Sequence, residues 1–539
     1  MVPVSTDRLN RLSSQFSEHY APNAKRLVKV GTTDALQPAR RGGMVTGDHL
    51  SRTEPAVRDR GTPKKMNTAM QDVLARQKAA HLRDGAPSAE QRIDRIDRCI
   101  GLLVDHAKAI EDALNADFGN RSREASRLTD IAGSIGPLKH ARENLRKWMK
   151  PERRKTSPAI LGLFGARAEV VFQPKGVVGI ISPWNFPINL TFAPLAGVLA
   201  AGNRAMIKPS EFTPQTSELM KVMFGKVFSE EEIAVVTGGP ELGQAFSELA
   251  FDHLIFTGAT SIARHVMRAA AANLVPVTLE LGGKSPVVIS RTADMATAAA
   301  RIMNGKTLNA GQICLAPDYV LAPDDRVGEF VTQAQAAVGR MFPTIKDNPD
   351  YTSVVAQRHY DRIMGYIDDA RAKGAEIIEL KPESEDLSQQ EHRKIAPTLI
   401  LNPTDDMTVM QEEIFGPVLP VKTYRTTDDA IGYINAHDRP LGLYWFGDDE
   451  TEKSRVLSAT TSGGVTVNDV IFHVAQEDLP FGGVGPSGMG SYHGVDGFRE
   501  FSHRKAIYTQ LKKDIGPMIQ MRPPYGPSIR KYLAGQIGR

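Results

Sequence analysis

Hydrophobic residues in the middle of this chain occur in short runs that alternate with longer helical patterns. The runs are rich in Val, Ile and Leu, which predicts buried β-strands. They occupy residues 177–181, 205–207, 233–236, 254–256 and 277–279. Stretches with helical apolar spacing lie between them, for example at 190–201 and 214–226. This alternation predicts βαβ units and a parallel sheet.

The preceding region, residues 67–150, has a helical pattern throughout. One apolar face contains Ile93, Ile96, Ile100, Leu103 and Val104, at spacings of three, four, three and one. Cys99 falls on the same face and is interpreted as a small buried hydrophobe.

A second α/β unit is predicted to begin near Pro286. An alanine-rich helix is expected at 292–305, and further apolar segments lie at 318–322, 327–341, 358–373 and 418–421. The charged stretch 380–392 is predicted to be a surface loop.

Composition limits the class of protein. A chain of 539 residues is too long for one hydrophobic core, and its 41% hydrophobic and 24% charged residues are typical of a soluble globular protein. Two cysteines cannot form a disulfide framework, so we expect a reducing, cytoplasmic location. There is no apolar run long enough to span a membrane and no secretory signal pattern.

The net charge of +4 is unevenly distributed. Residues 1–65 hold 12 Lys/Arg and 6 Asp/Glu, or +6, which leaves 4 − 6 = −2 for the rest. The main part of the chain therefore gives no electrostatic reason to expect nucleic-acid binding. Residues 1–65 are predicted to be a disordered basic extension. Three interpretations stay open: a functional tail, a dispensable extension, or a true start at Met66 or Met70.

Polar or glycine-containing turns follow four of the predicted parallel strands. Ligands bind beyond the carboxyl ends of such strands. Asn185, Lys208, Glu211, Gly258 and Glu280 are therefore expected to meet at one edge of the sheet.

Each of these residue types suits a particular role. Lys208 can donate a hydrogen bond to a ribose hydroxyl, and Glu211 can accept from the paired hydroxyls. The alternative is that the two residues form a surface ion pair. Gly258 lets backbone N–H groups approach a diphosphate at a helix start, but without a G-x-G-x-x-G pattern this signal is weak. A carboxylate at Glu280, ending an apolar strand, is costly unless functional. Asn185, between two prolines, offers an oxyanion donor or an Asx-turn cap.

Cys314 is a candidate nucleophile. It lies in a loop punctuated by Gly311 and Pro317, between a predicted helix and a predicted strand. Buried structural cysteines prefer regular apolar elements, whereas a deprotonated cysteine is strongly nucleophilic near neutral pH.

From about residue 70 to 508 the chain resembles the aldehyde dehydrogenase superfamily. The motifs that carry the resemblance are Pro183–Pro187, Lys208–Glu211, Phe256–Gly258, Leu279–Pro286, Gly311–Cys314 and Glu412–Pro417, in the family's order. The stretch 479–494 resembles the class 3 branch and, within it, the bacterial coniferyl aldehyde dehydrogenases. The hydrophobic C-terminal anchor of membrane-bound class 3 members has no counterpart after Tyr508.

The resemblance implies an α/β aldehyde dehydrogenase fold. Its parts are a Rossmann-like parallel-sheet cofactor domain, an α/β catalytic domain and a small oligomerisation β-extension. The implied boundaries are 66–150 and 176–280 for the NAD-binding domain, 151–175 and 500–515 for the oligomerisation segments, 281–499 for the catalytic domain and 516–539 for a C-terminal tail. Strand-like runs at 168–172 and 505–512 are candidates for pairing between the subunits of a homodimer.

The resemblance also implies the roles of individual residues. Cys314 becomes the nucleophile, Glu280 the general base, and Asn185 the oxyanion donor together with the Cys314 backbone N–H. The implied cofactor-binding residues are Lys208 and Glu211 at the adenosine ribose, Gly258 near the diphosphate, and Trp184, Glu413 and Phe415, the last two at the nicotinamide half. No metal is implied. Ala259-Thr260 departs from the Ser-Thr or Asn-Thr of many members.

The expected activity is NAD-dependent oxidation of an aldehyde, of the coniferyl or a related aromatic type, to the acid. Glu211 disfavours the 2′-phosphate of NADP, although Lys208 partly offsets this repulsion. Alternatives are a long-chain aliphatic aldehyde dehydrogenase, a CoA-acylating or phosphorylating enzyme, and a non-enzymatic protein that keeps the fold. Substrate-pocket candidates, each equally compatible with the core, are Phe186, Tyr444, Trp445, Phe472 and His493.

Overall fold

A computed structural model describes residues 63–157, 159–514, 516–517, 520 and 522–538. All of these residues belong to one compact body, Gly61–Arg539. Its six-stranded and seven-stranded sheets, each with the helices packed around it, are called the first and the second unit below. Most of the predicted basic extension lies outside the described residues. Its last three positions, 63–65, form the start of helix α2 (Pro63–Asp84).

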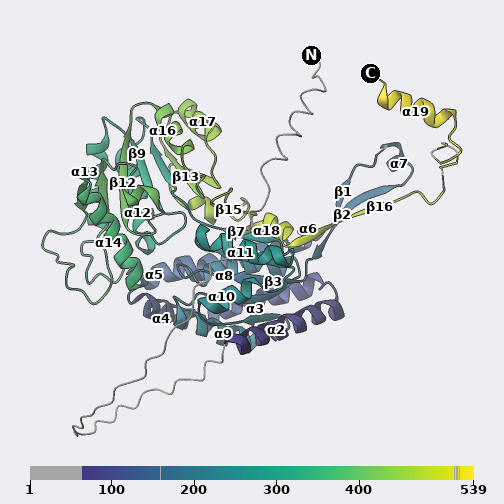
Figure 1. Cartoon of the computed structure of the whole chain (residues 1–539), viewed down its shortest axis with the longest axis horizontal. Coiled ribbons are helices and arrows are strands. Elements are labelled where there is room, and N and C mark those ends of the chain that lie inside the picture. The colour runs from purple at the N-terminus through teal and green to yellow at the C-terminus, as the bar shows by residue number, and fades with distance from the viewer. Residues whose placement is uncertain (1–62, 158, 515, 518–519, 521, 539) are drawn as a thin grey trace, which may run out of the picture. The chain divides into compact units, whose positions relative to one another are not determined.

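The predicted parallel sheet is present. Five parallel strands and one antiparallel strand are arranged in the order β15-β7-β6-β3-β4-β5 (Figure 1). Their bounds are β3 Val177–Ile181, β4 Arg204–Lys208, β5 Ile233–Val235, β6 His253–Thr257, β7 Val277–Glu280 and β15 Gly488–Met489. Because β15 pairs with β7, the chain returns to this sheet within the range 281–499 that was predicted for the catalytic domain.

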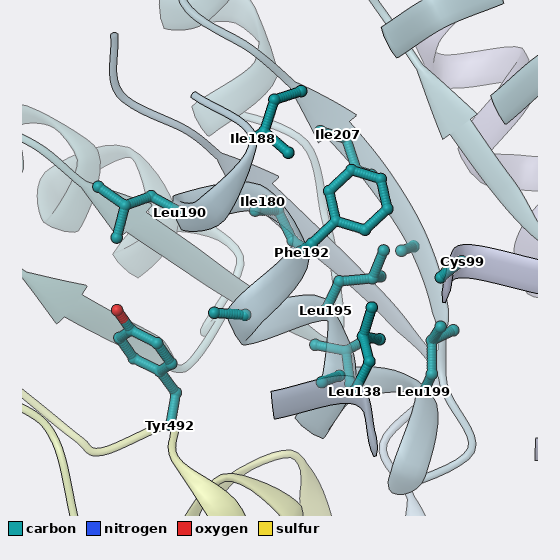
Figure 2. Close-up of a cluster of buried hydrophobic side chains, with 14 of the residues drawn as sticks. Cys99, Leu138, Ile180, Ile188, Leu190, Phe192, Leu195, Leu199, Ile207 and Tyr492 are labelled. Atoms are coloured by element: carbon teal, nitrogen blue, oxygen red, sulfur yellow. The ribbon is translucent and has the colours of Figure 1, made fainter. Parts of the chain in front are cut away.

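Helix α8 (Asn189–Ala200) lies at the centre of this first unit. Every residue from Leu190 to Ala200 is buried, since α3 and α6 pack against the helix. Figure 2 shows the apolar cluster around it, with Phe192, Leu195 and Leu199 of α8, Ile180 and Ile207 of the sheet, and Cys99 of α3. An all-round apolar helix of this kind belongs inside a core.

Further helices of the first unit lie before, between and after the segments that form its sheet. They are α3 (Ala89–Asp105), α4 (Ala107–Phe118), α5 (Arg123–Ser126), the π-helical turn η1 (Arg127–Ala132), α6 (Gly133–Trp148), α9 (Pro214–Val227), α10 (Pro240–Ser247), α11 (Thr260–Ala272) and α18 (Gly494–Glu500). The predicted face of α3 is correct for Ile96, Cys99 and Leu103, which are buried. It is wrong for Val104, which is 58% exposed because α3 ends one residue later.

The second unit has a seven-stranded sheet in the order β10-β11-β12-β9-β8-β13-β14, in which only β10 is antiparallel. The strands are β8 Pro286–Ile289, β9 Tyr319–Pro323, β10 Glu376–Glu379, β11 Thr398–Leu401, β12 Val418–Tyr424, β13 Gly442–Phe446 and β14 Gly464–Val467. The helices are α12 Met295–Thr307, α13 Val327–Met341, α14 Gln357–Ala372, α15 Thr408–Gln411, α16 Thr427–Asn435 and α17 Glu450–Ala459, with short 3-10 turns η2 Leu308–Gly311 and η3 Phe472–Ala475. Residues 380–392 form no helix or strand, as predicted.

A third, antiparallel sheet joins segments far apart in the sequence. Strand β2 (Arg167–Pro174) pairs with β1 (Glu152–Arg154) and with β16 (Ser502–Thr509), so β1 and β16 are its edges (Figure 1). Two further helices are α7 (Ala159–Leu163) and α19 (Pro527–Ile537).

Candidate active site

A cavity opens at the carboxyl ends of the first sheet's strands, where it meets loops of the second unit. Seven of the nine predicted site residues line it: Trp184, Asn185, Gly258, Glu280, Cys314, Glu413 and Phe415. Lys208 and Glu211 lie outside this lining, at the end of β4. The position beyond the carboxyl ends of parallel strands agrees with the general rule for open α/β sheets.

The loop that carries Cys314 has an unusual backbone. Asn309 and Ala310 have φ of 51° and Gly311 has φ of 70°, so three consecutive residues are in the left-handed region. A Cβ on Gly311 would overlap the carbonyl oxygen of Gly416. Gly311 is therefore required for the close contact between this loop and the segment that bears Glu413.

Gln312 holds this loop in place through its fully buried side chain. Its amide nitrogen donates to the carbonyl oxygens of Asn309 (2.9 Å) and Ser353 (3.1 Å). Its amide oxygen accepts from the backbone N–H of Val355 (3.0 Å). A satisfied buried network of this kind makes the position of the adjacent Cys314 well defined.

Asn185 is hydrogen-bonded directly to the loop that carries Cys314. Its Nδ2 donates to the carbonyl oxygen of Gln312 at 3.2 Å. Its own carbonyl oxygen accepts from Asn309 Nδ2 at 3.2 Å and from Arg121 Nη1 at 2.8 Å. Because Nδ2 carries two N–H groups, one remains for a substrate oxygen.

Arg121 and Asp130 form a buried ion pair behind Asn185, which the sequence pattern did not reveal. Arg121 Nη2 lies 2.6 Å from Asp130 Oδ2, and the two side chains are 1% and 0% exposed. The other carboxylate oxygen accepts from the backbone N–H groups of Ile188 (3.2 Å) and Asn189 (3.3 Å). The pair thus binds both ends of the 185–189 segment. Asp130 lies in the π-helical turn η1, a distortion often found at functional sites.

Glu280 ends strand β7 and is almost completely buried. Neither of its carboxylate oxygens has a hydrogen-bond partner among the described residues. Burial raises the pKa of Glu280 to about 8, and the nearby Cys314 thiol opposes this shift only in part. A carboxyl group with such a pKa can accept a proton near neutral pH.

The pKa of the Cys314 thiol is raised well above its usual value. Burial is the main cause, followed by the carboxylates of Glu280 and Glu413. The thiol therefore needs a proton acceptor or a nearby positive charge to become a nucleophile.

Glu413 and Phe415 come from the second unit. Burial, with the negative charge of Asp318, raises the pKa of Glu413 to about 8, and its Oε1 has no partner among the described residues. A Cβ on Gly282 would overlap the Glu413 carboxylate. Phe415 meets Trp184 edge-on, with ring centroids 5.3 Å apart.

Lys208 and Glu211 form an ion pair with an Nζ–Oε2 distance of 2.6 Å. The Lys208 side chain is only 4% exposed and that of Glu211 is 31% exposed, so the pair joins a buried lysine to a carboxylate at the surface. Gly258 directly precedes Ala259, the N-cap residue of α11. The N–H groups at this helix start suit a phosphate.

A model of the aldehyde dehydrogenase family matches residues 50–507. The chain belongs to this family. It is 78% identical over 468 residues to a probable coniferyl aldehyde dehydrogenase of Caulobacter vibrioides, covering 87% of this chain and 96% of that protein. It is 55% identical over 463 residues to the coniferyl aldehyde dehydrogenase of Pseudomonas sp. strain HR199, covering 86% and 95%.

Solved structures of aldehyde dehydrogenases share the fold. The substrate-bound state of Staphylococcus aureus AldH has a TM-score of 0.80 and 35% identity, covering 87% of this chain and 99% of that one. The Mycobacterium tuberculosis aldehyde dehydrogenase complexed with NAD+ has a TM-score of 0.73 and 28% identity, covering 84% and 91%. The predicted fold class is thereby confirmed.

Among the other residues that line the cavity of this aldehyde dehydrogenase, two are titratable and were missed from the sequence. His359 and Arg362 lie on α14, and both ring nitrogens of His359 lack partners among the described residues. Burial, with the charges of Arg362 and Arg358, lowers the pKa of His359 to about 4. Arg362 donates to the carbonyl oxygen of Ile414 at 2.9 Å. The only sequence signal was the basic cluster on one helix.

The predicted substrate-pocket residues are divided between core and surface. Trp445 is buried in the core of the second unit. The Tyr444 hydroxyl donates to the carbonyl oxygen of Leu315, the residue after Cys314, at 2.5 Å. Phe472 is 55% exposed, whereas Phe186 and His493 are buried.

Within the described residues, no group of His, Cys, Asp and Glu side chains is arranged to hold a metal ion. None of the described helices is long and apolar enough to cross a membrane.

Proposed function

We propose that this aldehyde dehydrogenase oxidises an aromatic aldehyde of the coniferyl type to its carboxylic acid, with NAD+ as the preferred hydride acceptor. The observation that carries the proposal is the buried, unpartnered carboxylate of Glu280 in the same cavity as Cys314. Relatives of high identity are named for coniferyl aldehyde, which supports the substrate class.

The residues present fit a nicotinamide dinucleotide. Lys208 and Glu211 would hold the adenosine ribose, and the start of α11 at Gly258 would face the diphosphate. Trp184, Phe415 and Glu413 would surround the nicotinamide half; Glu413 Oε1 is buried without a partner among the described residues, as expected for an acceptor of ribose hydroxyls. When bound, this cofactor accepts a hydride, and the positive charge of its ring favours a nearby thiolate.

The first step is attack by the Cys314 sulfur on the aldehyde carbon. The Cys314 thiol first loses its proton to solvent, the resulting thiolate forms the S–C bond, and the carbonyl π electrons move to oxygen. Asn185 Nδ2 and the Cys314 backbone N–H donate to this oxyanion. Loss of one such donor costs about 3 kcal/mol in the transition state.

The second half-reaction is hydrolysis. Removal of a hydride from the attacked carbon leaves a thioester on Cys314. Ionised Glu280 takes a proton from water as the water oxygen bonds to the thioester carbon. The C–S bond then breaks, its electron pair stays on sulfur, and the acid leaves. A base positioned for water favours hydrolysis over acyl transfer to CoA.

We also propose a homodimer that works in the cytoplasm. Strand β16 is an exposed edge of the three-stranded sheet, and unpaired edges of this kind form intersubunit sheets. Both cysteines are free thiols, which suits a reducing compartment. Sedimentation velocity on the full chain tests the dimer; a monomer at micromolar concentration would contradict it.

A panel of aldehydes assayed with NAD+ and NADP+ tests the activity. We expect the highest kcat/KM for coniferyl aldehyde with NAD+, without added CoA or phosphate. A higher kcat/KM for a long-chain aliphatic aldehyde would refute the substrate class. Turnover that requires CoA would refute the hydrolytic mechanism.

A further inference from the structure

A group of polar side chains outside the lining of the catalytic cavity takes no part in the proposed mechanism. It consists of His140 on α6, His473 on η3, and Glu477 and His493 on the loops around β15. Nε2 of His473, Oε2 of Glu477 and Nδ1 of His493 are buried and have no hydrogen-bond partner among the described residues. Buried polar atoms are nearly always paired, so several unpaired ones in one place indicate that something else pairs with them.

Aromatic rings connect this polar cluster with the nucleophile loop. The His493 ring stacks on Phe481 at 4.9 Å, and Tyr492 meets Phe481 edge-on at 5.6 Å. On the other side, the His473 ring lies 6.3 Å from that of Tyr444. The Tyr444 hydroxyl is bonded to Leu315, the residue after the nucleophile.

The apolar core cluster that Cys314 packs against also contacts side chains next to the polar cluster. These are Ile135 on α6, and Ile471 and Val474 beside His473. Figure 2 shows two members of that cluster, Leu190 and Tyr492, on one side of α8. The nucleophile and the neighbours of the polar cluster therefore share one apolar core.

The polar cluster lies where α6 meets the loops around β15, and it reaches solvent. A Cβ on Gly136 would lie 3.8 Å from Glu477 Oε1, and a Cβ on Gly494 would lie 3.4 Å from His140 Nε2. His140 Nε2 is also 3.2 Å from a carboxylate oxygen of Asp478, whose side chain is 90% exposed. The cluster thus reaches the protein surface at Asp478.

The charge state of the cluster suits acceptance of a hydrogen bond. Burial, with the negative charge of Asp478, raises the pKa of Glu477 to about 7. Burial, with His473 and His140, lowers the pKa of His493 to about 4, so its ring is neutral near pH 7. Tyr492 lies within electrostatic reach of both ends, because burial and then Glu280, Cys314 and Glu477 all raise the pKa of its hydroxyl.

We propose that Glu477, with His493 and His140, binds the ring hydroxyl of a 4-hydroxyphenyl aldehyde whose carbonyl group lies at Cys314. This inference rests on the proposed function and deepens it. An amphipathic substrate, with an apolar conjugated middle and a hydroxyl at the far end, matches hydrogen-bond acceptors that border the apolar core shared with the nucleophile. An aliphatic aldehyde would leave those acceptors unpaired, which is a strong basis for discrimination.

The test compares two substrates that differ only at the far end: coniferyl aldehyde and its 4-O-methyl ether, which has no O–H to donate. The variants are Glu477→Met, which removes the acceptor, and Glu477→Gln, which keeps a neutral one. No protein group loses a hydrogen bond in either variant, because none is bonded to the Glu477 side chain among the described residues. We expect Glu477→Met to lower kcat/KM for coniferyl aldehyde about tenfold or more and to leave the methyl ether within about twofold. Glu477→Gln should recover part of the loss.

The matched control is Glu383→Met, in an exposed turn of the charged loop, which should change neither substrate. Equal losses for both substrates with Glu477→Met would show a structural role and overturn the inference, as would no loss for either. A wild-type enzyme that oxidises both substrates equally well would also overturn it while leaving the proposed function intact. Failure of the wild type to oxidise any aromatic aldehyde would instead refute the proposed function itself.

Discussion

The guanidinium of Arg121 holds the main-chain carbonyl of Asn185 at 2.8 Å, across 64 residues of sequence. The same guanidinium is paired with Asp130 at 2.6 Å, and Asp130 accepts from the N–H groups that close the segment. The position of the proposed oxyanion donor therefore depends on a buried ion pair that lies outside the cavity lining.

Replacement of Arg121 by Met should lower kcat more than it changes the KM for NAD+. The donor on Asn185 loses its backbone support, and misplacement of a catalytic group by about 1 Å costs about a hundredfold in rate. The uncompensated Asp130 carboxylate should also destabilise the fold by about 3 kcal/mol or more. Steady-state kinetics well below the melting temperature, with thermal unfolding in parallel, check both effects.

Arg142→Met is the matched control for this change. Arg142 pairs with Asp97 at 2.8 Å, but the two side chains are 35% and 47% exposed. Its loss should cost less than about 1 kcal/mol and leave kcat unchanged. An Arg121 variant that behaves like the Arg142 control would show that the buried pair does not position Asn185.

The two cysteines should differ sharply in reactivity. Burial raises the pKa of both thiols well above the usual range, but Cys99 is enclosed in the core whereas Cys314 lines the cavity. Iodoacetamide at pH 8.5 should modify Cys314 alone and abolish activity, and bound NAD+ should change the rate. Cys314→Ala should be inactive and unlabelled, while Cys99→Ala should keep wild-type activity. Peptide mass mapping checks the site, and label found mainly on Cys99 would contradict the assignment.

Glu280→Gln should stop turnover after the thioester has formed. The amide cannot take the proton from water, so intact-mass spectrometry should show the enzyme plus one acyl group after mixing with aldehyde and NAD+. In the wild type the base must be ionised, and its pKa is about 8. Hydrolysis should accordingly speed up as pH rises through about 8. A variant that turns over at the wild-type rate would refute the role of Glu280.

Glu211 should control the choice between NAD+ and NADP+. Its carboxylate, already paired with Lys208 at 2.6 Å, would repel a 2′-phosphate. Glu211→Gln removes the repulsion and frees Lys208, so kcat/KM for NADP+ should rise about tenfold relative to that for NAD+. The comparison uses one aldehyde at saturation. An unchanged ratio would place the adenosine ribose elsewhere.

Glu413 should make stability depend on pH. Its folded-state pKa of about 8 lies above the usual 4.5, so the folded protein binds this proton more tightly than the unfolded chain. The resulting stabilisation is complete below about pH 4.5 and is lost as pH rises toward 8. The melting temperature of Glu413→Gln minus that of the wild type should therefore increase as pH rises from 5 to 8.5. A constant difference would mean that the carboxyl group is not desolvated.

Most of the first sheet was predictable from local patterns. The runs at 177–181 and 254–256 are fully apolar and bounded by turns, so strand is the only element that suits their length, and the structure confirms both. Lys208 and Glu280 were found because a parallel sheet brings strand ends to one edge. Val104 shows the limit of this reasoning. Helical periodicity predicts which face of a helix is apolar, but not how far along the helix other elements pack against that face.

Other site features depend on contacts between distant segments. Nothing in the local pattern marks Arg121, in the loop before α5, or Asp130 as buried, yet both are buried behind Asn185. His359 and Arg362 enter the cavity only because the second unit packs against the first sheet. Periodicity and residue type contain no information about such neighbours.

By itself the sequence supplied the candidate reactive groups and their order: a thiol at Cys314 in a glycine-containing loop, a carboxylate at Glu280 after an apolar strand, and an amide at Asn185 between prolines. These follow from local rules of burial and turn formation. Only the tertiary structure decided their protonation and partners. Desolvation and the charges of distant segments set the pKa values of Glu280 and Cys314, because both effects depend on what packs around a group rather than on its neighbours in the chain.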